Sequence, residues 1–75
     1  MKFIWEKDDI KLGRKYSKPN CDMIDIWIIG YIASMDNKTN YVSISLNDGM
    51  VCDPVSASDL ADKLTVNGYI PVEFL

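Results

Sequence analysis

The fold of this chain is decided by the stretch Ile24-Asp25-Ile26-Trp27-Ile28-Ile29-Gly30-Tyr31-Ile32, followed by Tyr41-Val42-Ser43-Ile44-Ser45-Leu46 and then by Asn47-Asp48-Gly49-Met50-Val51. The side chains of an extended chain alternate between two faces, and the two longer segments have residues that favour strands. The breaks between the segments are rich in Asp, Asn and Gly, which are typical turn residues. Gly49 suits the left-handed last position of a three-residue hairpin loop. The stretch from Ile24 to Val51 therefore predicts three consecutive antiparallel strands.

Both faces of the first of these strands are apolar. Its even positions, from Ile24 to Ile32, hold four isoleucines, and we expect this face to form the core. The odd positions include Trp27 and Tyr31 and are also largely apolar. A strand of this kind belongs in the centre of a sheet, under a helix, or at a contact with another chain. In the strand 41–46 the odd positions are Tyr, Ser and Ser, so we expect that face to be wet.

Residues before the central stretch predict one further strand. Positions 10–17 alternate between apolar and polar residues, and Gly13 indicates a bulge or a close backbone approach within the strand. Residues 18–22 contain proline, asparagine and aspartate and predict a loop.

Residues after the central stretch predict a helix and a last strand. Positions 56–64 have helical spacing, with Ser56 as the N-cap, and Asn67-Gly68 ends the helix. Positions 69–74 alternate again, with Ile70, Val72 and Phe74 facing inward, and Pro71 places this strand at a sheet edge. We therefore predict one domain, residues 1–75, of the α+β class and mainly β, with a small antiparallel sheet of about five strands and one short helix before the last strand.

Composition limits the class of protein further. The chain has 75 residues, of which 48% are hydrophobic and 25% are charged, a balance typical of globular proteins. A chain of this size buries only about 60% of its unfolded surface on folding, so contact with a partner or a second copy would add stability. No run of 18 apolar residues predicts a transmembrane helix, and the charges that follow Trp5 do not fit a signal peptide. We expect a cytoplasmic protein that does not associate with membranes.

The residues that catalysis or metal binding would need are scarce. The chain has no histidine, and its two cysteines, Cys21 and Cys52, lack the spacing of a metal or redox motif. We expect both thiols to be reduced. Carboxylate pairs occur at Asp8-Asp9 and at Asp59 with Asp62, but a charged turn and helix capping explain them. Phosphate-binding glycine motifs are missing from the sequence. We predict that the protein is not an enzyme and uses no metal or other cofactor.

The net charge of −3 is unevenly distributed. Residues 1–18 hold six of the eight basic residues against three acids, and residues 19–75 hold two against eight. Residues 11–18 combine basic side chains with the aromatic ring of Tyr16. Nucleic-acid binding uses this combination, because basic groups neutralise phosphates and aromatic rings stack on bases. The acidic remainder argues against nucleic acid as a partner. A nucleic-acid-binding module using segment 11–18 stays open as an alternative, as does an acidic inhibitor of a host nucleic-acid-binding protein, like some proteins of mobile elements.

The order of the elements resembles that of SH3-like or Tudor-like small β-barrels. The resemblance covers residues 11–74 and rests on Trp27-Ile28-Ile29-Gly30-Tyr31-Ile32, the hairpin to Tyr41-Val42-Ser43-Ile44, and Asn47-Asp48-Gly49 before a helical turn and a last strand. It implies an SH3-like barrel that binds ligands among loops near the first and last strands. The chain departs from that pattern by its well-capped helix.

The leading functional prediction is a small non-catalytic module that binds another protein or, as a homodimer, itself. Residues 24–35 carry more apolar and aromatic groups than one short helix can cover. Aromatic anchors dominate the energetics of protein interfaces, and an arginine at the rim would steer an acidic partner. The side chains that we expect to line the contact are Trp5, Arg14, Tyr16, Trp27, Tyr31 and Tyr69.

Overall fold

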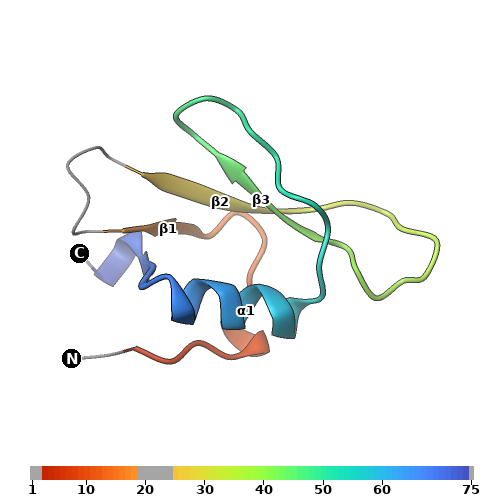
Figure 1. Cartoon of the computed structure of the whole chain (residues 1–75), viewed down its shortest axis with the longest axis horizontal. Helices are drawn as coiled ribbons and strands as arrows, with labels where there is room; N and C mark the ends of the chain where they lie inside the picture. The colour runs from red at the N-terminus through yellow and green to blue at the C-terminus, as the bar shows by residue number, and fades with distance from the viewer. Residues whose placement is uncertain (1–2, 19–24, 75) are drawn as a thin grey trace.

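The computed structural model describes residues 3–18 and 25–74 and contains a four-stranded antiparallel sheet with one α-helix packed on it (Figure 1). The predicted class, α+β and mainly β, is confirmed. Cys21, Ile24 and most of the predicted loop 18–22 lie outside the described residues. The elements, in chain order, are η1 (Lys7–Asp9), β1 (Lys15–Ser17), β2 (Ile26–Tyr31), β3 (Tyr41–Ser45), α1 (Ala57–Val66), β4 (Ile70–Pro71) and η2 (Val72–Phe74), where η denotes a single turn of 3-10 helix.

The sheet is open, with the strand order β3-β2-β1-β4, and β3 and β4 form its edges. No barrel closes. The sequence predicts about five strands, whereas the described residues form four. The segment after Gly49 pairs with β3 through isolated bridges only, between Val51 and Ile44 and between Val55 and Tyr41. Pro54 lies between these two bridges and has no N–H to donate, so the pairing does not continue as a regular strand.

Turns and caps follow the sequence closely. The N–H of Gly13 donates to the carbonyl of Ile29 at 2.8 Å, and the N–H of Ile29 donates to the carbonyl of Arg14 at 3.0 Å. Gly13 and Arg14 thus lie together opposite Ile29, which confirms the predicted bulge, and the φ of +79° at Gly13 suits glycine. Gly49 has a φ of +76° in its predicted turn. The Ser56 hydroxyl accepts a hydrogen bond from the Asp59 N–H at 3.1 Å and caps α1.

The first and last strands are shorter than predicted. β1 begins only at Lys15, because residues 11–14 form the turn that carries the bulge. β4 ends at Pro71, and Val72–Phe74 form η2 instead of continuing the strand. Phe74, predicted to face inward, packs its ring against those of Phe3 and Trp5 but remains 55% exposed. The predicted place of Pro71 at a sheet edge is confirmed.

The sheet turns the opposite face towards α1 from the one predicted. Strand pairing places Tyr16, Trp27 and Ser45 on one face, with Ile29 and Ser43 beside them. Ile29 is 4% exposed and packs against the helix in the core. The even positions of β2 therefore lie on the other face, and the serines of β3, predicted to be wet, lie on the helix side. Alternation fixes which residues share a face, but the large side chains of Tyr16 and Trp5 fill the space under the helix.

The core lies between this inner face of the sheet, α1 and the N-terminal segment, residues 3–10. In Figure 1 α1 and the N-terminal segment lie on the same side of the sheet. Tyr16 is fully buried, and its hydroxyl donates to the carbonyl of Asp9 at 2.9 Å. The buried residues of this core are Trp5, Ile10, Tyr16, Ile29, Leu60, Ala61 and Leu64.

Candidate functional site

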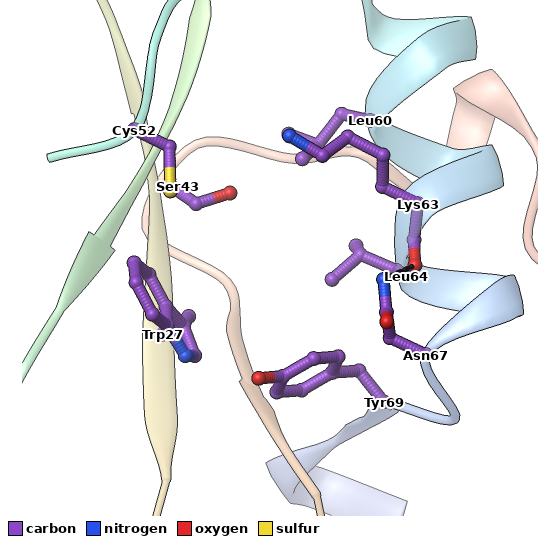
Figure 2. A pocket seen from close by; sticks show the side chains of 8 residues that line it. All are labelled: Trp27, Ser43, Cys52, Leu60, Lys63, Leu64, Asn67 and Tyr69. Atoms are coloured by element: carbon purple, nitrogen blue, oxygen red, sulfur yellow. Dashed lines mark hydrogen bonds between the residues drawn. The ribbon is translucent and has the colours of Figure 1, made fainter.

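A pocket of about 230 Å³ opens between α1 and the β2–β3 half of the sheet (Figure 2). α1 packs most closely on η1, in the N-terminal segment. The pocket is the space that remains over Trp27. Drug-sized ligands occupy pockets of about 300 to 1,000 Å³, so this one suits a smaller group. Its lining combines two aromatic residues, two leucines and four polar or sulfur-containing residues: Trp27, Tyr69, Leu60, Leu64, Ser43, Cys52, Lys63 and Asn67.

The two aromatic walls of the pocket are held by a single carboxylate. The indole Nε1–H of Trp27 donates to Asp25 Oδ1 at 2.5 Å, and the hydroxyl of Tyr69 donates to Asp25 Oδ2 at 2.6 Å. Trp27 comes from β2, and Tyr69 precedes β4. The two rings are thereby oriented by charge-assisted hydrogen bonds, which are stronger than neutral ones. The indole has no second donor, so Trp27 offers the pocket an apolar surface.

The other end of the pocket is polar. Figure 2 shows the Lys63 ammonium group and the Ser43 hydroxyl at the end of the pocket away from Tyr69, with Cys52 beside Ser43. Within the described part of the chain, neither the Lys63 nor the Ser43 side chain forms an ion pair or hydrogen bond. Cys52 carries a free thiol. The Asn67 side chain is engaged, because its amide donates to the Lys63 carbonyl at 2.7 Å. The pocket is therefore apolar at one end and rich in unused donors at the other.

The structure separates the six residues that the sequence singled out for a contact. Trp27 and Tyr69 share the pocket. Trp5 and Tyr16 belong to the core, with 7% and 0% exposed, so neither side chain is available to a partner in this conformation. Both are buried because the face of the sheet that meets α1 is the opposite one from that predicted, and large side chains fill the space there. Tyr31 is 55% exposed at the end of β2 and packs edge-on against Tyr41.

Arg14 joins the two ends of the chain instead of standing free at a rim. Its Nε donates to Glu73 Oε1 at 2.7 Å, and its Nη1 donates to the carbonyl of Asp9 at 3.0 Å. The guanidinium also lies 5.7 Å from the ring centres of Tyr16 and Phe74. The Glu73 pKa lies below its usual value, because the backbone N–H of Glu73 and then Arg14 favour the charged carboxylate. Arg14 is thus a structural residue in this conformation.

These positions bear on the two alternatives that the charge pattern left open. Tyr16 is buried and cannot stack on a base, and the charge of Arg14 is met by Glu73. Several acids serve local structure: Asp25 holds the pocket walls, and Asp48 accepts the N–H of Met50 at 2.9 Å. The geometry therefore favours neither base stacking by segment 11–18 nor a surface of free aspartates.

Sequence reasoning missed Lys63, Ser43 and the role of Asp25. A signal for the helix wall exists, since Leu60, Lys63, Leu64 and Asn67 follow the i, i+3, i+4, i+7 spacing of one helix face. Alternation predicts that Ser43 faces the solvent, whereas the structure turns it towards α1 with Ile29.

The face of the sheet turned away from α1 is aliphatic. Pairing aligns Lys15, Ile28 and Ile44 across β1, β2 and β3, and a bridge adds Val51 to the row. Val42 and Ile44 lie over Gly30, with side-chain atoms 3.1 and 3.0 Å from where a Cβ would stand. We call this the outer face and define it by Ile26, Ile28, Gly30, Val42, Ile44 and Val51.

Comparisons with known proteins give no assignment. No family model, no curated protein and no solved structure matches the chain. The resemblance to SH3-like and Tudor-like barrels therefore stays a prediction. Across residues 3–18 and 25–74, no group of three or more His, Cys, Asp or Glu residues is arranged to hold a metal ion. Among the helices of this part of the chain, none is long and apolar enough to cross a membrane.

Proposed function

We propose that this protein is a small non-catalytic module that binds protein through its outer face, and that the occupant of this face is a second copy of the chain. The observation that carries the proposal is the composition of the face. Its centre is the half-buried pair Ile28 and Ile44, with the more exposed Val51 beside them, while Val42 is itself buried. None of the described helices packs on this face, because α1 and η1 lie on the inner side. Contiguous apolar surface of this kind marks interaction sites.

A second copy fits the outer face because the charges at its borders are complementary to one another. Lys15 is exposed at the β1 border, in the same row as Ile28. Asp53 is exposed at the opposite border, two residues after Val51, which lies on the outer face. When two outer faces pack about a two-fold axis parallel to the strands, Lys15 of each copy approaches Asp53 of the other. Such a contact is closed and symmetric.

Sedimentation velocity from low to high micromolar concentration tests the proposal. We expect a monomer–dimer equilibrium that weakens in Ile28→Thr and Ile44→Thr, which keep a β-branched side chain but place a hydroxyl in the contact. Val66→Thr is the matched control, because Val66 is 81% exposed on α1. A wild-type chain that stays monomeric throughout this range would refute the proposal.

Charge exchange tests the two-fold arrangement itself. Lys15→Glu and Asp53→Lys should each weaken the dimer, because each places like charges opposite one another. The double variant should restore it. Lys38→Glu, in the loop between β2 and β3, is the control. Equal weakening in both single variants without recovery in the double variant would contradict the arrangement.

A further inference from the structure

We propose that the pocket between α1 and the β2–β3 half of the sheet binds a small aromatic carboxylate, with the ring between Trp27 and Tyr69 and the carboxylate at Lys63 and Ser43. This site is on the opposite side of the sheet from the outer face, so it is independent of self-association. It goes beyond the proposed function by adding a small-molecule site to a protein-binding module.

The lining of the apolar end of the pocket indicates that the ligand carries an aromatic ring. Asp25 accepts hydrogen bonds from both Trp27 and Tyr69, at 2.5 and 2.6 Å, and so fixes both rings before any ligand enters. Leu64, a buried residue of α1, also lines the pocket. Aromatic rings pack favourably on one another in offset or edge-on geometry, and pre-oriented walls reduce the entropy lost on binding. A flat ring is therefore the group that this end selects.

The hydrogen-bond donors at the other end of the pocket indicate that the ligand carries a carboxylate. Lys63 and Ser43 supply an ammonium group and a hydroxyl, and within the described residues neither side chain has an ion-pair or hydrogen-bond partner. The negative charge of Asp25 is held at the other end by its two aromatic donors. An anion at Lys63 would therefore gain a charge-assisted hydrogen bond without displacing an existing one. The pocket is polarised, and a ligand with one apolar end and one anionic end matches it.

The volume restricts the size of the ligand. At about 230 Å³ the pocket is smaller than those that hold drug-sized molecules, so it fits one ring with a short acid chain. An aromatic acid with a single ring belongs to this size class, and a dinucleotide does not.

Three probes of matched shape test the proposal on the whole chain: 3-phenylpropanoate, 3-phenylpropanamide and propanoate. Binding is followed by titration while recording the indole N–H resonance of Trp27, with that of Trp5 as the internal control. The acid should shift the Trp27 signal in a saturable manner. The amide lacks the charge and should bind about tenfold more weakly, since a hydrogen bond to a charged group exceeds a neutral one by about 1.4 kcal/mol. Propanoate lacks the ring and should not saturate.

Variants separate the charge from the remainder of the pocket. Lys63→Gln should weaken the acid about tenfold and leave the amide unchanged. Lys38→Gln, which removes a lysine from the loop between β2 and β3, should change neither. Equal binding of acid and amide, no effect of Lys63→Gln on the acid, or no saturable shift at Trp27 would each overturn the proposal. A monomeric chain that still binds the acid would refute the proposed self-association and leave this inference standing.

Discussion

The indole Nε1–H of Trp5 donates a hydrogen bond to the backbone carbonyl of Tyr69 at 2.7 Å, across 64 positions of the chain. The backbone N–H of Trp5 also donates to the Thr65 hydroxyl at 2.8 Å. These two bonds tie the N-terminal segment to the end of α1 and to the residue that forms one wall of the pocket. Trp5 is therefore a structural link between the core and the candidate site.

Replacing Trp5 with phenylalanine should destabilise the fold by about 1 to 3 kcal/mol, because the Tyr69 carbonyl loses its donor and the smaller ring leaves space in the core. Urea unfolding followed by circular dichroism measures the change. Ile4→Ala is the control, since Ile4 is 75% exposed and its loss should change stability by less than about 0.5 kcal/mol. Equal stability of Trp5→Phe and wild type would show that the link contributes nothing.

The orientation of the sheet predicts opposite outcomes for two neighbouring isoleucines. Ile29 is 4% exposed against α1, so Ile29→Ala should cost about 2 to 5 kcal/mol. Ile28 lies on the outer face and is partly exposed, so Ile28→Ala should cost about 1 kcal/mol in the monomer. Unfolding is measured at low micromolar concentration, where self-association contributes least. A larger loss at Ile28 than at Ile29 would mean that the sheet faces the other way.

Tyr16 should make the fold sensitive to alkaline pH. Burial raises the pKa of the Tyr16 hydroxyl above its usual value of 10.0, so folding favours the neutral form. The stability that this provides is fully present below pH 10.0 and is lost as the pH rises through the folded pKa. Tyr16→Phe should lose about 1 kcal/mol at neutral pH with the bond to Asp9. Its stability should then fall less than that of wild type above pH 10.0. Parallel stability curves for the two proteins would rule out this role.

Asp36 should make the loop between β2 and β3 sensitive to acid. The backbone N–H of Lys38, the Ser34 hydroxyl and the Thr39 N–H donate to its carboxylate and hold its pKa well below 3.8. A lowered pKa contributes stability that is present above pH 3.8 and is lost as the pH falls through the folded pKa. Asp36→Asn should therefore be less stable than wild type at neutral pH, and the difference should shrink in acid. A difference that is constant across this range would exclude the carboxylate as its cause.

Local signals in the sequence predicted the local structure well. The Ser56 cap, the end of α1 near Asn67, the bulge at Gly13 and the turn at Gly49 each depend on a few neighbouring residues. Strand pairing between β2 and β3 also followed from their alternation. These features need no knowledge of what lies elsewhere in the chain.

The orientation of the sheet could not be predicted in the same way. Both faces of β2 are apolar, and counting isoleucines favoured the even positions. The choice depends on Tyr16 and Trp5, which are distant in the sequence and fill the space beneath the helix. Serines on the inner face are tolerated because Ser45 accepts the Asn47 N–H at 3.2 Å and Ser43 borders the open pocket. The pocket lies on the inner face of the sheet, so choosing the wrong face as the core face also hid the pocket.

The pairing along β3 also limits how copies of this chain can assemble. The N–H and carbonyl of Tyr41 are both bonded to Val55, and the N–H of Cys52 donates to the Ser43 carbonyl at 2.9 Å, so the backbone on that side is already occupied. On the opposite side, Pro71 has no N–H to offer. Both edges therefore offer a neighbouring strand fewer free backbone groups, which reduces the tendency of the sheet to grow into fibres although its outer face is aliphatic.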